Sequence, residues 1–229
     1  MSTLAVIPAR GGSKGLPGKN LAEINGVSLV ARAVNVARES GVIDNVVVTS
    51  DDQEILNAAM VAGAITVERP PALATDTARI EDAIIHALEQ YSLLHPSPEV
   101  LVLLQPTSPL RQPSTISDAI HKFRKHELVG SIYGVVECEH HPYKAFIAKG
   151  DHLVPVSETE FLSLPRQNLP KAFRQSGSIY VVSVRNFLEH KSLLVNPVRP
   201  IEVSQEEAID IDSKADLEIA RQVANHLNA

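Results

Sequence analysis

The segment AVIPARGGSKGLPGKN spans residues 5–20 and carries the clearest signal in the chain. A short apolar strand leads into a loop with four glycines, two lysines and one arginine, and an amphipathic helix is expected after it. Glycines allow backbone N–H groups to turn toward an anion, because no Cβ stands in the way. Arg10, Lys14 and Lys19 add full positive charges. We interpret the loop as a polyphosphate seat at the carboxyl end of a first β-strand, where α/β sheets place their ligands, rather than as a flexible basic surface loop.

The spacing of the glycines excludes two familiar phosphate loops. A Walker A motif, G-x-x-x-x-G-K-[ST], would need a glycine in place of Ser13 and a hydroxyl residue in place of Asn20. The dinucleotide fingerprint G-x-G-x-x-G fails at every glycine of the segment. The chain is therefore expected to be neither a P-loop ATPase nor a nicotinamide-dependent oxidoreductase.

Strands and helices alternate along the first 136 residues. Apolar or β-branched runs predict strands at Leu4–Pro8, Asn45–Ser50, Ile65–Glu68, Val100–Leu104 and Ser131–Val136. Apolar residues at helical spacing predict helices between them, from Ser28 to Gly41 and at Ile55–Ala62, Ala78–Tyr91 and about Ser114–His126. This alternation predicts an α/β fold with a doubly wound, mostly parallel sheet.

The pattern changes between about residues 138 and 173. Several prolines, the turn Lys149-Gly150-Asp151 and the lack of helical periodicity indicate an insertion of short strands and extended chain. Further strands are predicted at Ser178–Val184, Val198–Val203 and Ile209–Ile211, and a capping box, Ser213-x-x-Asp216, opens a helix to about Leu227. We expect one domain over residues 1–229 with a protruding insertion.

Two further segments carry polar groups suited to chemistry. Residues 105–111, QPTSPLR, directly follow a predicted strand. Their prolines either hold the polar side chains in place to orient a ligand, or only stiffen a loop that binds nothing. Near the end of the chain, Asp210 and Asp212 alternate with two isoleucines, and in extended chain residues two apart share a face. Adjacent carboxylates repel, and a hard divalent cation such as Mg²⁺ relieves that repulsion. The alternative is that Asp212 only caps the last helix.

The composition limits the class of protein. The chain has 229 residues, 44% of them hydrophobic and 21% charged, which is typical of a globular domain. Its net charge of −6 argues against a nucleic-acid binder, and its apolar runs are too short to span a membrane. The start lacks the basic region of a signal peptide, and the single cysteine, Cys138, fits a reducing compartment. We therefore expect a cytoplasmic protein with no nucleic-acid or membrane partner.

Five motifs together resemble the CMP-sialic acid synthetase family, whose members activate keto-deoxy acid sugars with CTP. They stand in the family's order and cover nearly the whole chain: IPARxxSKGLxxKN at 7–20, RPxxLAxDT at 69–77, LLQPTSPLR at 103–111, a basic insertion, and DID at 210–212. One departure is Arg79-Ile80, where some sialic acid synthetases carry small hydroxyl residues. The resemblance implies a Rossmann-like sheet of the nucleotidyltransferase type, in which the insertion at about 138–173 makes a homodimer.

The resemblance also implies roles for individual residues. Nucleotide contacts are expected at Ala9, Arg10, Gly12, Ser13, Lys14, Asn20, Arg69 and Asp76. Contacts to the acceptor sugar are expected at Gln105, Thr107, Ser108, Lys144, Arg166, Gln167, Arg174 and Tyr180, with Arg166 reaching the active site of the other subunit. Charge stabilisation is expected from Arg10, Lys14 and Lys19, and a catalytic Mg²⁺ (or Mn²⁺) is expected on Asp210 and Asp212. His140 and His141 are interpreted as structural or dimer-contact residues.

These expectations describe a cytidylyltransferase that joins CMP from CTP to a nonulosonic acid and releases pyrophosphate. N-acetylneuraminate is the first candidate for this nine-carbon acceptor, and a legionaminate or pseudaminate acceptor is the alternative. The enzyme for the eight-carbon keto-deoxy acid of lipopolysaccharide has a different first loop. A non-catalytic nucleotide sensor is the alternative from another class, and the intact pair Asp210 and Asp212 weighs against it.

Overall fold

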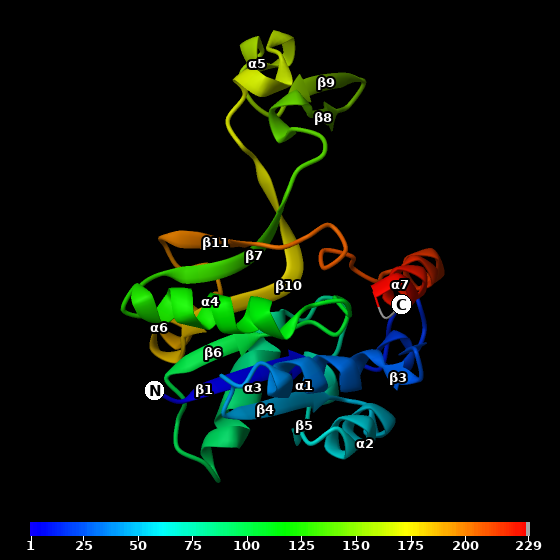
Figure 1. Cartoon of the computed structure of the whole chain (residues 1–229), viewed down its shortest axis with the longest axis vertical. Helices are drawn as coiled ribbons and strands as arrows, with labels where there is room; N and C mark the ends of the chain where they lie inside the picture. Colours follow the sequence, from blue (N-terminus) through cyan, green and yellow to red (C-terminus); the bar gives the residue numbers. More distant parts are fainter. Residues whose placement is uncertain (228–229) are drawn as a thin grey trace.

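A seven-stranded sheet forms the centre of the computed structural model, which describes residues 1–227 (Figure 1). Its strands stand in the order β11-β7-β10-β6-β1-β4-β5. Their bounds are Thr3–Pro8 (β1), Asn45–Ser50 (β4), Ile65–Glu68 (β5), Val100–Leu103 (β6), Ser131–Glu137 (β7), Phe173–Ser183 (β10) and Val198–Glu202 (β11). Only β10 runs antiparallel to its neighbours; the other pairs are parallel. The predicted mostly parallel sheet is confirmed.

Helices cover both faces of the sheet, which is why its strands are apolar on both sides. On one face, Ala5 and Ile7 pack under α1 (Leu29–Glu39), α2 (Gln53–Val61) and α4 (Pro113–Lys125). On the other, Leu4 and Val6 pack under α3 (Ile80–Ser92) and α6 (Val184–His190). The doubly wound architecture is thus confirmed. None of the helices within residues 1–227 has both the length and the apolar character needed to cross a membrane.

A third apolar cluster holds the end of the chain beside the first loop. It joins α7 (Lys214–Leu227) to the small hairpin of β2 (Glu23–Ile24) and β3 (Val27–Ser28), with Ile211 and Leu110 buried between them. The Asp216 carboxylate accepts hydrogen bonds from the Ser213 N–H (2.7 Å) and hydroxyl (2.7 Å). The predicted capping box is therefore confirmed, and Asp212 does not serve as the cap.

Four sequence predictions of secondary structure are wrong in detail. Ile209–Ile211 is not a strand, because it forms no ladder with another strand. The Ile209 N–H bonds the nearby Glu206 carbonyl (3.2 Å), and the Ile211 N–H bonds the Thr107 carbonyl (2.8 Å). β10 begins at Phe173 rather than Ser178, since its first residues pair with the end of β7. Val184 opens α6 instead of closing a strand. The first loop leads into a 3₁₀ turn, Lys19–Leu21, and the β2–β3 hairpin before α1, where an amphipathic helix was expected directly.

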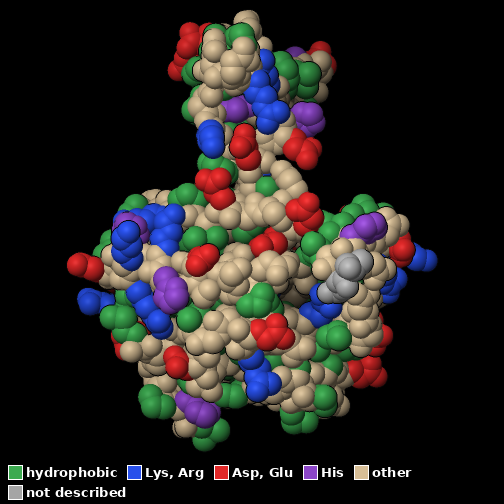
Figure 2. All heavy atoms as spheres, viewed as in Figure 1, with side chains coloured by type: hydrophobic (Ala, Val, Ile, Leu, Met, Phe, Trp, Pro, Cys, Tyr) green, Lys and Arg blue, Asp and Glu red, His purple; other side chains and the backbone are tan. Residues whose placement is uncertain are grey.

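Residues 138–172 form a projection that stands away from the sheet (Figures 1 and 2). It contains the hairpin of β8 (Phe146–Lys149) and β9 (His152–Pro155), the short helix α5 (Glu160–Ser163), and 3₁₀ turns at Pro142–Lys144 and Arg166–Asn168. Phe146, Ile147 and Leu153 are exposed on its hairpin. His141 is buried at its base, where one ring nitrogen bonds the Pro170 carbonyl (2.8 Å) and the other accepts from the Tyr143 N–H (3.2 Å). This arrangement supports the structural interpretation of His141.

Candidate active site

The glycine-rich loop is fixed at both of its ends. The Gly11 N–H donates to the Asp51 carboxylate (3.0 Å), and the Asn20 amide donates to the Arg10 carbonyl (2.9 Å). Gly18 adopts a left-handed φ of 66°, which glycine reaches without strain. The loop between β1 and Lys19 is therefore held in one shape by hydrogen bonds from its own glycine and asparagine.

Lys19 ties this loop to the segment that contains Asp210 and Asp212. Its ammonium donates to the Ile211 carbonyl (3.1 Å) and to the Asp212 carboxylate (2.9 Å). A Cβ at Gly15 would collide with the Asp212 carbonyl, so the two segments pack together only because residue 15 is glycine. Two motifs almost two hundred residues apart in the chain thus form one site.

A cavity of about 250 Å³ opens between the loop and the start of α3. It brings together seven of the predicted site residues: Arg10, Lys19, Asn20, Arg69, Asp76, Gln105 and Thr107. The cavity lies at the carboxyl ends of β1 and β6, which is where the sequence places a ligand. Arg79 and Ile80, where the sequence departs from the family pattern, line the cavity too, and Leu73 supplies a further wall.

Arg69 is the most unusual residue of this cavity. It is only 6% exposed, and its Nε and Nη2 atoms have no hydrogen-bond partner among the described residues. Burial lowers the pKa of its guanidinium, and Asp51, 3.7 Å away, opposes that shift. Buried donors without acceptors are costly, so these groups are poised for an acceptor supplied by a ligand.

Asp76 pairs with two cations that the sequence assigns to a polyphosphate. Its carboxylate lies 2.8 Å from the Arg10 guanidinium and 2.6 Å from the Lys14 ammonium. The hydrogen bond from Lys14 is the main reason that the pKa of Asp76 is lowered. An anion that enters the loop therefore competes with Asp76 for both cations.

Asp210 and Asp212 face solvent while Ile211 between them is fully buried, so the predicted alternation of faces is confirmed without a strand. The pKa of Asp210 is raised above its usual value. Desolvation by the surrounding protein is the main cause and the nearby Asp212 carboxylate adds to it, while the hydrogen bond from the Thr107 hydroxyl opposes it. Residues 1–227 contain no cluster of three or more His, Cys, Asp or Glu side chains that would hold a metal alone. Two carboxylates nevertheless fit Mg²⁺, which takes its remaining oxygens from water and substrate phosphates.

The predicted acceptor-sugar residues divide into two groups. Near the cavity, Gly177 has a left-handed φ of 75°, and a Cβ there would lie 3.2 Å from the Ser108 hydroxyl and 3.3 Å from the Gln105 amide oxygen. The Ser108 hydroxyl is buried and has no partner among the described residues. Tyr180 donates to Gln175 (3.3 Å) and packs edge-on against Tyr133. These groups form a polar wall beside the carboxylates.

The second group lies outside this cavity. Lys144, Arg166 and Gln167 belong to the projection, where Arg166 donates to the Cys138 carbonyl (3.0 Å). Arg174 is exposed on β10 and bonds the neighbouring Gln175 carbonyl (3.4 Å). Within one chain, then, the structure does not bring these four residues to the nucleotide cavity.

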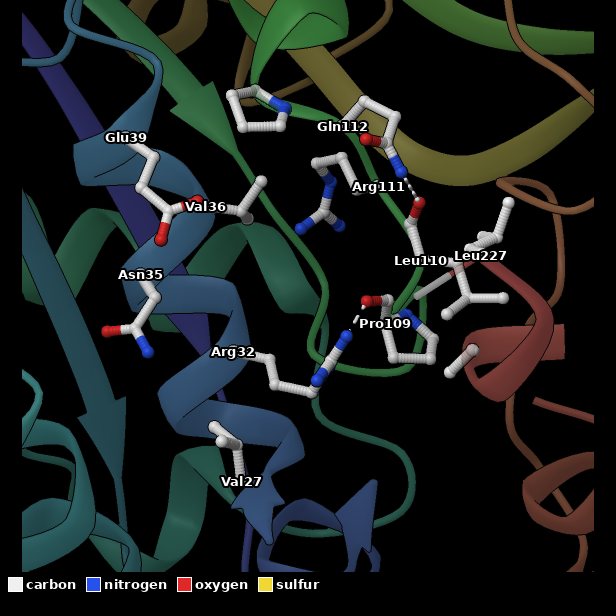
Figure 3. Close-up of a pocket in the computed structure, with 12 residues that line it drawn as sticks. Val27, Arg32, Asn35, Val36, Glu39, Pro109, Leu110, Arg111, Gln112 and Leu227 are labelled. Carbon is white, nitrogen blue, oxygen red and sulfur yellow. Dashed lines mark hydrogen bonds between the residues drawn. The ribbon is translucent and has the colours of Figure 1, made fainter. Parts of the chain in front are cut away.

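Arg111 serves the fold. It is buried, and its guanidinium donates to the carbonyls of Gln105 (2.8 Å) and Ser178, which fixes the 105–111 loop against β10. Burial lowers its pKa to about 10, so it stays cationic at neutral pH. A larger cavity of about 540 Å³ lies behind this loop (Figure 3). There Arg32 donates to the Pro109 carbonyl (3.4 Å), and none of the predicted phosphate or metal residues lines it.

Asp51 is a further residue at this site that the sequence patterns did not identify. It stands directly after β4, however, and the rule that polar groups at the carboxyl ends of parallel strands meet would have identified it.

Comparisons with known proteins identify the family to which this chain is similar. Residues 4–152 match the family model described as cytidylyltransferase. The chain is 32% identical to CMP-N,N'-diacetyllegionaminic acid synthase of Legionella pneumophila subsp. pneumophila, over 94% of this chain and 93% of that protein. It is 29% identical to N-acylneuraminate cytidylyltransferase of Streptococcus agalactiae, over 94% of this chain but only 52% of that longer protein. The solved structure of CMP:2-keto-3-deoxy-manno-octonic acid synthetase complexed with CTP shares the fold, with a TM-score of 0.74, 18% identity and coverage of 99% of this chain and 100% of that one.

Proposed function

This chain belongs to the cytidylyltransferase family, and on that premise we propose that it joins CMP from CTP to a nonulosonic acid and releases pyrophosphate. The observation that carries the proposal is the contact of Lys19 with Asp212, because it sets a cationic phosphate loop against a pair of carboxylates. A triphosphate and the divalent cation that accompanies it need those two features side by side.

The nucleotide half of the reaction falls to the first loop and its surroundings. Arg10, Lys14 and Lys19 stabilise the charge on the triphosphate, and backbone amides at Gly12 and Ser13 add donors. The Ala9 N–H is not such a donor, because it bonds the Thr49 carbonyl (3.0 Å). Asn20 holds the loop and lies beside the ribose and α-phosphate. Arg69, whose buried donors lack partners, supplies hydrogen bonds to acceptors on the base or ribose. Asp76 pairs with Arg10 and Lys14 before the phosphates arrive, and the phosphates displace it from both cations.

The acceptor half of the reaction is an in-line substitution. The anomeric hydroxyl of the sugar forms a bond to the α-phosphorus, loses its proton, and pyrophosphate leaves with the electrons of the broken P–O bond. Asp210 and Asp212 would hold the metal, Mg²⁺ or Mn²⁺. Bound there, it would neutralise phosphate charge and lower the pKa of a coordinated hydroxyl. Gln105, Thr107, Ser108 and Tyr180 orient the sugar.

The projection at about residues 138–173 makes a homodimer in this proposal. Its exposed Phe146, Ile147 and Leu153 are apolar side chains on a hairpin that one chain leaves uncovered. In the dimer, Lys144, Arg166 and Gln167 of each subunit reach the partner's acceptor site, and Arg174 completes it. The guanidinium of arginine pairs well with the sugar carboxylate. The protein works in the cytoplasm.

N-acetylneuraminate is the acceptor we test first. A second candidate, N,N'-diacetyllegionaminate, is favoured by the 32% identity to a legionaminic acid synthase along almost the whole of both chains. Pyrophosphate release from CTP and Mg²⁺ is measured with each acid separately and with none. Release that requires one of the acids supports the proposal. Release that occurs without any sugar contradicts it.

A further inference from the structure

β4 lies beside β1 in the sheet (Figure 1), and Asp51 directly follows β4, as the phosphate loop follows β1. The turn around it is rigid, because the Ser50 hydroxyl accepts from the Asp52 N–H (3.0 Å) and Asp52 caps α2 through the Glu54 N–H (2.8 Å). Asp52 is thereby engaged in capping. The Asp51 carboxylate is left to accept the Gly11 N–H (3.0 Å).

The loop is pressed closely against this turn. A Cβ at Gly11 would lie 2.8 Å from the Asp52 carboxylate oxygen and 2.9 Å from its Cβ, which real side chains avoid. Gly11 therefore has to be glycine for its N–H to reach Asp51. The contact joins the backbone N–H of Gly11 to the Asp51 side chain, and the close packing of Gly11 against Asp52 holds the two segments at that distance.

The same carboxylate oxygen also faces Arg69. It lies 3.7 Å from the Arg69 Nη2 atom, which makes no hydrogen bond within residues 1–227. The Arg69 N–H bonds the Ser50 carbonyl (2.7 Å), so the two residues are held by adjacent strands. Asp51 is 25% exposed and Arg69 only 6%, so the attraction between them is screened less than at the surface.

A carboxylate beside a polyphosphate seat works against anion binding by its charge alone. The unfavourable charge of Asp51 at this place must be offset by another effect, and its contacts with Gly11 and Arg69 indicate which one. We infer that Asp51 is a positioning residue, which fixes the distance between the phosphate loop and Arg69 so that both ends of one nucleotide are held at once. This inference rests on the proposed function, because it assigns Arg69 and the loop to the two ends of CTP.

The test compares whole and partial ligands on the full chain by titration calorimetry. CTP spans both ends of the site, tripolyphosphate occupies the loop, and CMP occupies the Arg69 end. In Asp51→Ala we expect CTP affinity to fall about tenfold, the size of one lost hydrogen bond to a charged group. The affinities for tripolyphosphate and for CMP should each change less than about threefold, because each end alone stays intact.

The matched control is Asp44→Ala. The Asp44 carboxylate accepts the Thr3 N–H (2.7 Å). It thereby joins β1 to β4 at their amino ends, as Asp51 joins the segments after their carboxyl ends. It should leave the affinities for all three ligands unchanged. If Asp51→Ala does not fold, Asp51→Asn replaces it, and the same pattern is expected at about threefold because the amide still accepts from Gly11.

Three results with the variants would overturn the inference, and a fourth with the unaltered chain would also remove the proposed function. CTP affinity unchanged in the Asp51 variant would show that the contact is passive. An equal loss for CTP and tripolyphosphate would show a purely local effect on the loop, and an equal loss in Asp44→Ala would show a general effect on the fold. If the unaltered chain does not bind CTP, the proposed function fails and the inference falls with it.

Discussion

Replacing Lys19 with methionine tests the link between the phosphate loop and the carboxylate pair. The Lys19 side chain is 17% exposed. The change keeps its length and removes the ammonium, which donates to Ile211 and Asp212. The bond to the Ile211 carbonyl is charge-assisted and contributes about 1.5–3 kcal/mol. The pair with Asp212, which is 76% exposed, contributes less than about 1 kcal/mol because solvent screens it.

Two effects of different size are therefore expected. The free energy of unfolding should fall by about 2 kcal/mol, which lowers the melting temperature of a chain of this size by roughly 4–8 °C. Removal of one preorganised charge-stabilising donor costs about 3 kcal/mol in the transition state, so kcat should fall by roughly 10²–10³. Urea unfolding measures the first effect, and pyrophosphate release at saturating CTP and sugar measures the second.

Lys122→Met is the matched control. The Lys122 ammonium also donates to a backbone carbonyl, that of Pro200 (2.7 Å), but it lies on α4 and does not line the nucleotide cavity. It should keep the kcat of the unaltered chain. A folded Lys19→Met with kcat within tenfold of that value would refute the role of Lys19, and so would an equal loss of kcat in the control.

Three other changes probe the site. Asp212→Ala should abolish turnover, because several kcal/mol of metal-dependent charge stabilisation are lost. The elution volume in gel filtration should stay unchanged. Near-normal activity at saturating Mg²⁺ would show that Asp212 does not bind the metal. Asp76→Asn should tighten CTP binding severalfold, because it frees Arg10 and Lys14 and removes a negative charge near the triphosphate. Weaker CTP binding in calorimetry would contradict the competition between Asp76 and the phosphates. Burial, then the neighbouring Tyr180 and Glu81, raises the pKa of Tyr133 to about 12. The folded chain thus keeps a proton that the unfolded chain loses, so stability should fall by about 1.4 kcal/mol per pH unit between pH 10 and 12, and urea unfolding of Tyr133→Phe should lack this component of the slope.

The sequence alone predicted the structure correctly wherever a local pattern of residues decides it. Apolar runs located the parallel strands, and the position of polar groups after β1 and β6 located the cavity. The alternation of Ile209 and Ile211 with two aspartates predicted which side chains face solvent. It wrongly predicted a strand, because a strand needs a neighbour with a full ladder, and this segment has one backbone bond to a distant segment, at Thr107, and one within its own turn, to Glu206.

Contacts between distant segments were beyond the reach of the sequence. Arg10, Lys14 and Asp76 were each assigned to a nucleotide, but their mutual pairing depends on how the start of α3 lies over the loop. The role of Arg111 depends on the carbonyl of Ser178, which a strand far along the chain brings beside it. The position of Asp51 after a predicted strand marks it as a candidate, but its contact with the Gly11 N–H leaves no mark in the sequence.

The transfer itself is the central claim, and product identification tests it most directly. The chain is incubated with CTP, Mg²⁺ and an equimolar mixture of N-acetylneuraminate, N,N'-diacetyllegionaminate and pseudaminate, and the products are identified by mass spectrometry. We predict one CMP-linked nonulosonic acid, formed in the same amount as pyrophosphate. Binding of CTP with no CMP-sugar from any of the three acids would contradict the account and leave a nucleotide-binding protein without transferase activity.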